Sequence, residues 1–304
     1  MYTVLARRYR PESFDSLVGQ ERVAETLKNA IRMGRVGHAY LFCGPRGVGK
    51  TSAARILAKA LNCREGVSAE PCLKCENCLG IAKGHAVDVT EIDGASNNSV
   101  DDVRAIRENA HYAPLSGTYK IYIIDEIHMV TRAGFNALLK ILEEPPEHVV
   151  FIAATTEAHK IPETVLSRFQ RFDFKSIVDT DIAKRLKQIC EQESVDIEAE
   201  VLAGLATYAD GGMRNAQSSL DQLITFAGGE KISARHMGEL LGILTETDLL
   251  DLMSKIHSQD IPAVLGFLDT LSARNIRPPL VLDQLHHMIR DLMRLKHLGA
   301  MAGR

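Results

Sequence analysis

The sequence contains no tryptophan, and aromatic residues make up only 5% of its 304 positions. This scarcity argues against a surface of aromatic side chains on which single-stranded nucleic acid stacks its bases. No apolar run approaches the ~20 residues needed to cross a bilayer. The N-terminus, MYTVLARRYRPESF, carries charge where a secretion signal has an apolar stretch. We therefore expect neither a membrane protein nor a secreted one, but a cytoplasmic protein.

The chain also lacks the compositional bias of disordered or fibrous proteins, since 45% of its residues are hydrophobic and 25% are charged. Its net charge of −3 conceals an uneven distribution. Residues 1–60 hold eleven Lys or Arg and four Asp or Glu, a net charge of +7 that leaves −10 for the remainder. A basic N-terminal region favours phosphate as a neighbour, from nucleotide or nucleic acid, although a solvated basic face has the same signature.

Four short β-rich runs predict buried strands. They cover residues 38–44, 87–93, 120–125 and 149–155. Three segments between or beside them place apolar side chains at helical spacing. These cover residues 51–61, 100–110 and 132–144, and Pro145-Pro146 ends the last one. Strands that alternate with helices predict an α/β domain with a parallel sheet and helices on both faces.

After about residue 176 the strand patterns stop, and amphipathic helical patterns follow. They cover residues 180–193, 198–210, 213–228, 249–256, 261–271 and 280–298. The pattern predicts three domains. They are an α/β domain over 1–176, a small helical domain over 177–243 and an all-helical segment over 244–304.

Residues 44–51, GPRGVGKT, match the phosphate-loop pattern G-x-x-x-x-G-K-[ST] between a predicted strand and a predicted helix. Glycines let backbone N–H groups converge on phosphate oxygens, and the helix N-terminus adds partial positive charge. Lys50 is expected to reach the β- and γ-phosphates, and Thr51 to ligate Mg²⁺. A chance glycine-rich turn is the alternative. The residues expected to bind phosphate are Gly44, Arg46, Gly47, Val48, Gly49, Lys50, Thr51 and Ser52.

Asp125 and Glu126 end an apolar strand, where carboxylates are costly unless they meet metal, water or a partner. We expect Asp125 to hold Mg²⁺, directly or through water, and Glu126 to orient and polarise an attacking water. The alternative is an acidic strand end that caps a loop. Thr155 and Thr156 end the next strand, where they either contact the γ-phosphate or the water, or are simply a strand-end pair.

Four of the six cysteines follow the pattern C-x8-C-x2-C-x2-C: Cys63, Cys72, Cys75 and Cys78. This spacing favours zinc, and four thiolates leave no open coordination position, so the site is expected to be structural. It would fold a small insert at about residues 62–80 that lacks a core of its own. A redox site or an iron–sulfur cluster is the alternative. Cys43 and Cys190 stand in apolar contexts and are expected in the core.

Taken together, these motifs resemble the clamp-loader branch of the AAA+ ATPases, in particular subunits of the bacterial DNA polymerase III clamp loader. The resemblance covers essentially the whole chain. Its motifs are RYRPESFDSLVGQE (8–21), HAYLFCGPRGVGKTSAARILAKALNC (38–63), EIDGASNNSVDDVR (91–104), IYIIDEIHM (121–129), FNALLKILEEPPEHVVFIAATTEAHKIP (135–162), LSRFQRFDF (166–174) and DGGMRNAQSSLDQ (210–222). It implies an AAA+ domain with a zinc insert, a helical lid and a partial helical collar for the three predicted domains.

The resemblance also implies roles that spacing cannot supply. Thr156, with Thr155 as a second candidate, matches the first sensor, and Arg214 matches the second sensor, which touches ATP in its own subunit. Arg168 matches the arginine that reaches a neighbouring subunit's ATP, although Phe169 replaces the usual cysteine after it. From the residues alone, either arginine is equally an ordinary salt-bridge residue.

Two further sets of residues are implied by position in the family. The residues implied to line the adenine site are Arg7, Tyr9, Pro11 and Val18. The residues implied to contact DNA phosphates are Asn97, Asn98, Arg104, Arg132 and Lys140.

The implied function is an ATPase that uses Mg²⁺, carries structural Zn²⁺ and loads a sliding clamp onto primer–template DNA. The implied partners are delta and delta prime subunits, further copies of this chain, the clamp and the DNA. A nucleotide kinase with a zinc lid is one alternative, but it would not need Glu126 beside Asp125. A second alternative is a non-hydrolysing clamp-loader scaffold, which typically lacks the phosphate-loop lysine or the acidic pair, whereas this chain keeps both. A third is a branch-migration motor, and the cysteine insert argues against it.

Overall fold

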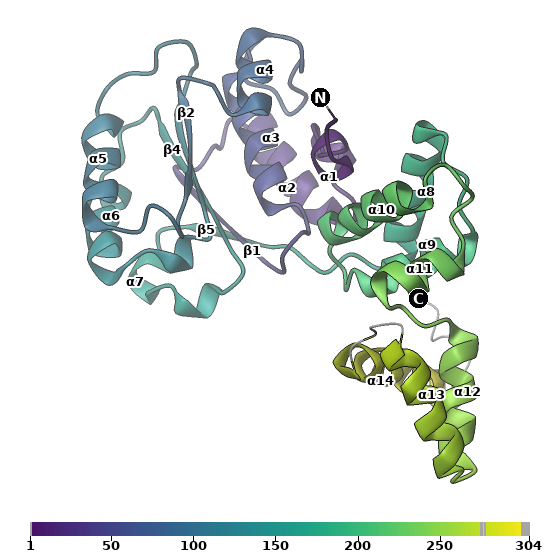
Figure 1. Ribbon diagram of the computed structural model, residues 1–304. Coiled ribbons are helices and arrows are strands. Elements are labelled where there is room, and N and C mark those ends of the chain that lie inside the picture. Colours follow the sequence, from purple (N-terminus) through teal and green to yellow (C-terminus); the bar gives the residue numbers. More distant parts are fainter. Residues whose placement is uncertain (1, 274–275, 277, 299–304) are drawn as a thin grey trace. The chain divides into compact units, whose positions relative to one another are not determined.

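The computed structural model describes residues 2–273, 276 and 278–298, and it divides into two compact units (Figure 1). The first unit runs to Ile182 and includes the separate segment Gly211–Asn215. The second unit holds Ala183–Asp210 and the residues that follow from Ala216. The last part of the predicted collar, residues 299–304, lies outside the described residues.

Five parallel strands form the sheet of the first unit, in the order β2-β3-β4-β1-β5. The strands are β1 (Ala39–Cys43), β2 (Val89–Asp93), β3 (Lys120–Asp125), β4 (Val149–Thr155) and β5 (Gln170–Asp173). The first four confirm the predicted strands. The sequence patterns missed β5 because this edge strand has no buried residue and therefore no apolar run.

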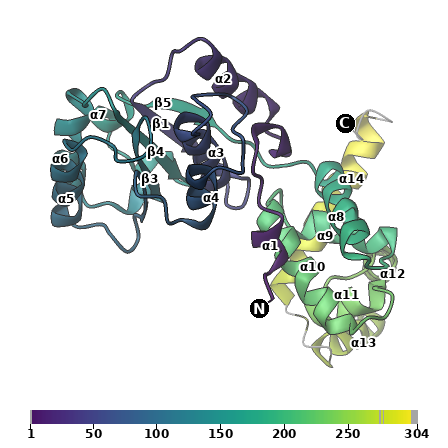
Figure 2. The ribbon, with the colours of Figure 1, turned by 90° about the horizontal axis from the view of Figure 1, so that it is seen from above.

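Helices cover both faces of this sheet, as the alternating pattern predicts (Figures 1 and 2). Along β1, Tyr40 and Phe42 point into one apolar cluster while Leu41 and Cys43 point into the other, because strand side chains alternate between faces. The first cluster includes α2 (Glu21–Arg32) and α3 (Lys50–Asn62), and the second includes α5 (Val100–Ala110), α6 (Arg132–Glu143) and α7 (Glu163–Leu166).

The carboxyl ends of the central strands meet at one edge of the sheet. Strand β1 ends at Cys43, which pairs with Thr155 at the end of β4, and β3 ends beside them at Asp125. Ligands of open parallel sheets bind at this edge. The short elements of the first unit are α1 (Leu5–Arg8), η1 (Phe14–Ser16), α4 (Glu76–Lys83), η2 (Ile127–Met129) and η3 (Ala158–Lys160).

The second unit is helical in its described part, as predicted. Its helices are α8 (Asp179–Glu193), whose first residues belong to the first unit, α9 (Ala199–Tyr208), α10 (Met213–Ala227), α11 (Ala234–Leu241), α12 (Glu246–His257), α13 (Ile261–Ala273) and α14 (Pro278–Leu298). A separate core that includes Leu249, Leu252 and Leu271 holds the last three together. The patterns did not predict α2, α4 or α11. Among the described helices, none is both long and apolar enough to cross a membrane.

Candidate functional site

The phosphate loop leaves β1 and enters α3 with three glycines at positive φ. Gly44, Gly47 and Gly49 have φ of 151°, 82° and 105°, which L side chains rarely adopt. A Cβ at Gly44 would also lie 2.4 Å from the carbonyl oxygen of Phe174. In the same loop, Val48 and Ser52 are buried and Arg46 is exposed. The shape of this loop therefore requires its glycines.

The Lys50 side chain folds back over the phosphate loop. Its Nζ donates to the carbonyl oxygens of Gly44 (2.8 Å) and Pro45 (2.7 Å), and the residue is 6% exposed. Burial lowers the pKa of Lys50, while the nearby charges of Glu126 and Asp125 raise it. In the described part of the chain Lys50 forms no ion pair, so neutral carbonyls hold an ammonium whose charge remains available to phosphate.

A hydrogen bond joins the start of α3 to the end of β3. The Thr51 hydroxyl donates to Asp125 Oδ2 (2.9 Å), and the Glu126 N–H donates to Asp125 Oδ1 (3.1 Å). Hydroxyl and carboxylate oxygens are the hard ligands that Mg²⁺ prefers beside phosphate and water. Thr51 and Asp125 therefore fit the predicted magnesium site.

Glu126 has an unusual backbone and a clamped carboxylate. Its φ of 46° and ψ of 48° are left-handed, a conformation that costs a non-glycine residue energy and clusters at functional sites. Oε2 accepts hydrogen bonds from the Thr156 N–H and hydroxyl, both at 3.1 Å. The Thr155 hydroxyl lies instead 3.0 Å from His128 Nδ1, and Thr155 is fully buried. The two threonines thus differ, because only Thr156 contacts the predicted water-activating carboxylate.

Arg214 comes to the phosphate loop although 163 residues separate it from Thr51 in the sequence. Its N–H donates to the carbonyl oxygen of Gly47 (3.3 Å), and a Cβ on Gly47 would lie 3.4 Å from the Arg214 Cβ. Arg10 also belongs to this environment. Burial lowers the pKa of Arg10, as do the charges of Arg55 and Arg214, while Glu91 and Asp125 raise it. The sequence patterns did not single out Arg10 as a site residue, although it stands in the motif RYRPESFDSLVGQE.

Arg168 contacts α6 and α7 and, among the described residues, not the phosphate loop. Its guanidinium donates to the carbonyl of Thr164 in α7 and pairs with Glu143 at the end of α6. No described contact joins Arg168 to the phosphate loop of its own chain. The partner Glu143 lies 25 positions away in the sequence, so local spacing could not reveal it.

The positions implied for adenine lie in the segment before α2. Arg7 is exposed, and Tyr9, Pro11 and Val18 are half-buried. Leu17, next to Val18, packs toward the phosphate loop, since a Cβ on Gly49 would lie 3.4 Å from Leu17 Cδ2. The adenine roles themselves stay predictions.

The residues implied to contact DNA lie at the N-terminal end of α5 and along α6. Asn97 and Asn98 donate to the carbonyls of Asp93 (3.2 Å) and Ala95 (3.5 Å). Arg104 pairs with Asp101 on the same helix, and Arg132 and Lys140 are exposed on α6. These DNA roles also stay predictions.

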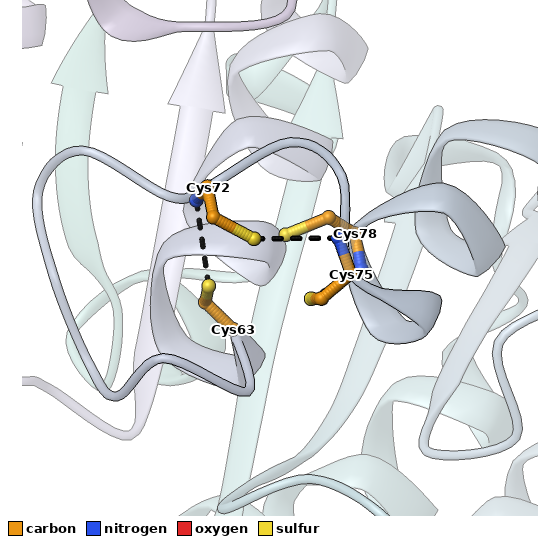
Figure 3. Close-up of side chains that lie close together, drawn as sticks. All are labelled: Cys63, Cys72, Cys75 and Cys78. Carbon is orange, nitrogen blue, oxygen red and sulfur yellow. Dashed lines mark hydrogen bonds between the residues drawn. The ribbon is translucent and has the colours of Figure 1, made fainter.

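The four predicted zinc ligands gather at the end of α3 and the start of α4 (Figure 3). Their Sγ atoms all lie within 4.8 Å of one another. Four thiolates about 2.3 Å from zinc in a tetrahedron would lie about 3.8 Å apart, so the cluster fits the ion after a small contraction. Backbone N–H groups point at the sulfurs, from Cys72 to Cys63 Sγ (3.4 Å) and from Cys75 to Cys72 Sγ (3.3 Å).

Thiol ionisation in the cluster is uneven. Partial burial alone would raise the pKa of Cys75, but hydrogen bonds from the N–H groups of Arg64 and Cys78 lower it to about 6. Burial raises the pKa of Cys78, and its hydrogen bond with Cys75 adds to that rise. The lowered pKa favours the thiolate of Cys75, whereas a metal bound by Cys78 would have to displace its proton. Cys43 and Cys190 are buried in the core, as predicted.

Comparison with known proteins identifies the family. A family model described as "DNA polymerase III, delta subunit" matches residues 19–178, and one described as "DNA polymerase III clamp loader subunit, ATPase lid domain" matches residues 181–229. The chain is 44% identical over 302 residues to "DNA polymerase III subunit tau" of Bacillus subtilis, covering 99% of this chain and 54% of the relative. It is 45% identical over 275 residues to the tau subunit of Escherichia coli, covering 90% and 43%. The chain thus spans about half the length of these curated relatives.

A shorter relative and a solved structure complete the comparison. The "DNA polymerase III subunit gamma" of Buchnera aphidicola is 40% identical over 272 residues, covering 90% of this chain and 75% of the relative. The Thermotoga maritima RuvB Holliday junction branch migration motor superposes with a TM-score of 0.57 at 21% identity over 91% of both chains. The structural likeness shows the AAA+ fold alone, whereas the sequence relatives show the family. The chain belongs to the gamma/tau family of DNA polymerase III clamp-loader subunits.

Proposed function

We propose that the chain binds ATP with Mg²⁺ at its phosphate loop and hydrolyses it within a clamp loader, to place a sliding clamp on primer–template DNA. The observation that carries this proposal is one cluster at the sheet edge. There, Lys50 is held by neutral carbonyls, Thr51 bonds to Asp125, and Thr156 bonds to Glu126. These contacts bring together three segments of the chain with complementary chemistry.

Each residue has a separate task in this proposal. Lys50 and the loop N–H groups neutralise phosphate charge, and Thr51 and Asp125 are the chain's ligands for Mg²⁺. Glu126 orients the attacking water and accepts its proton, and Thr156 fixes the direction of that carboxylate. The metal and the triphosphate supply a polarised phosphoryl group. Arg214, which touches the loop at Gly47, compensates charge in the same subunit.

We propose that Arg168 completes the site of a neighbouring subunit. Its described partners lie on α6 and α7, and its side chain is 31% exposed, so a subunit docked there could reach it. A guanidinium supplied in this way is worth about 10³–10⁵ in rate. The isolated chain should therefore hydrolyse ATP slowly. The partners proposed are delta and delta prime subunits and further copies of this chain, with the clamp and the DNA as substrates.

The test is an ATPase assay of the chain alone and mixed with delta, delta prime, clamp and primed DNA. We expect slow turnover by the chain alone and strong stimulation only in the full mixture. Lys50→Ala should lose nucleotide binding, and the exposed Lys74→Ala serves as the matched control. Full activity of a monomer would contradict the role of Arg168. Turnover that depends on an added nucleotide acceptor would instead favour a kinase with a zinc lid.

A further inference from the structure

His128 connects the turn after β3 to the segment after β4. Its side chain is 6% exposed and belongs to η2, two residues after Glu126. Nδ1 lies 3.3 Å from Glu126 Oε2 and 3.0 Å from the Thr155 hydroxyl, and Nε2 lies 3.1 Å from Glu157 Oε2. A buried imidazole thus stands between two carboxylates that belong to different segments of the site.

We propose that His128 is a positioning residue, which holds the Glu126 carboxylate in the orientation that hydrolysis requires. This inference rests on the proposed function, because it takes Glu126 as the group that activates water. It adds to that function a bridge from Glu126 through His128 to Glu157, which the phosphate-loop and acidic-pair motifs do not include.

The contacts of Glu126 fall on one oxygen. Oε2 receives the Thr156 N–H, the Thr156 hydroxyl and the His128 ring, and none of the described contacts involves Oε1. A carboxylate held through one oxygen presents the other in a defined direction. Because the Glu126 backbone is left-handed, its side chain leaves the strand at an angle that the strand itself does not control. Its direction is therefore set by Thr156 and His128.

The opposite edge of the His128 ring is also held, because its Nε2 faces Glu157. The Glu126 and Glu157 carboxylates face opposite edges of the ring, with Nδ1 3.3 Å from Glu126 Oε2 and Nε2 3.1 Å from Glu157 Oε2. Glu157 is itself held, since Lys160 Nζ lies 2.8 Å from its Oε1 and the Glu157 N–H donates to the Thr155 hydroxyl (3.0 Å). The ring therefore cannot swing away from Glu126 without losing its contact with Glu157.

Three variants test the proposal in the full mixture of subunits, clamp and primed DNA. His128→Phe keeps a planar ring but removes both ring nitrogens, with their contacts to Glu126, Thr155 and Glu157, and His128→Asn keeps a donor near the position of Nδ1. Glu157→Ala removes the anchor, together with the exposed pair to Lys160, at a half-exposed site. Glu147→Ala, an exposed acidic residue after α6, is the matched control. The measurements are kcat, KM for ATP, nucleotide binding and thermal unfolding.

We expect His128→Phe to lower kcat about tenfold or more with KM for ATP within about twofold, because a transition-state contact is lost while binding is kept. His128→Asn should recover most of this loss, Glu157→Ala should cost about threefold, and Glu147→Ala should cost nothing. Equal kcat for wild type and His128→Phe overturns the inference, and so does an equal loss in the Asn and Phe variants. If His128→Phe does not fold, wild-type kcat in Glu157→Ala overturns it. If the wild-type mixture does not hydrolyse ATP at all, it is the proposed function that fails, and the inference falls with it.

Discussion

The cysteine cluster and the phosphate-loop site lie in the same unit but are assembled in opposite ways. The cluster draws its four sulfurs from residues 63–78, a stretch of sixteen residues. The phosphate-loop site combines residues from Lys50 to Arg214, carried by the start of α3, the ends of β3 and β4 and the first turn of α10. The cluster is thus local in the sequence, whereas the dispersed site depends on the packing of the whole sheet.

Removal of zinc from the cysteine cluster should change the structure most. It also tests most clearly whether the cluster and the phosphate-loop site are independent of each other. Structural zinc contributes on the order of 10 kcal/mol to a small metal-dependent fold. We expect chelation to remove hydrogen-exchange protection from α4 and the end of α3, while β3 and β4 keep theirs. Added zinc should restore the protection. Loss of protection throughout the sheet would show that the cluster is not an independent local element.

The arginine predicted to act between subunits should give the next largest effect. Arg168→Ala is expected to lower hydrolysis in the full mixture by about 10³ or more while nucleotide binding by the variant chain is unchanged. Arg171→Ala, an exposed arginine paired with Asp173 on β5, is the matched control. If Arg168→Ala instead weakened nucleotide binding by the isolated chain, the trans role would be wrong.

Glu126→Gln should separate binding from hydrolysis. The amide keeps the size of the side chain and can still accept from Thr156, but it cannot take a proton from water. We expect hydrolysis to fall by about 10²–10⁴ with nucleotide binding intact. Single-turnover hydrolysis and equilibrium nucleotide binding measure the two effects. Glu144→Gln, exposed at the end of α6, controls for loss of a negative charge, and unchanged hydrolysis in Glu126→Gln would exclude Glu126 as the base.

Substitution of Asp88 should have a smaller effect. Asp88 is intermediate between the local cluster and the dispersed site, since its carboxylate orders a loop 27–29 positions further along the chain. It accepts the N–H groups of Leu115 (2.7 Å), Ser116 (2.6 Å) and Gly117 (2.7 Å). Burial raises its pKa, but these hydrogen bonds outweigh burial and hold the pKa below its ordinary value of 3.8.

Asp88→Asn should therefore destabilise the protein by about 1–3 kcal/mol at pH 7. Because the folded-state pKa is depressed, the ionised group stabilises the fold above its ordinary pKa, and this contribution is lost as pH falls through the folded value. The difference between wild type and variant in denaturant unfolding should shrink below about pH 4. A constant difference across that range would mean that charge is not involved.

Particular residues show which parts of the two sites can be predicted from the sequence alone. The spacing of Cys63, Cys72, Cys75 and Cys78 predicts a cluster that the structure assembles, because turn geometry over a few residues decides it. Lys50 and Thr51 could also be identified from the sequence as candidate phosphate- and magnesium-binding residues, since the loop that carries them is a local motif. Arg10 was missed because its environment is made by burial and by charges that lie 45 or more positions away in the sequence, the nearest being Arg55.

The sequence by itself determined the order of the first four strands and of most helices, the shape of the phosphate loop and the cysteine cluster. These depend on hydrophobic periodicity and on backbone preferences that act within a few residues. Only the tertiary structure decided that Arg168 pairs with Glu143, that β5 joins the sheet edge, and that His128 lies between Glu126 and Glu157. Such contacts join segments that come together only when the sheet is packed, and charge and hydrogen-bond partners at that range leave no local pattern in the chain.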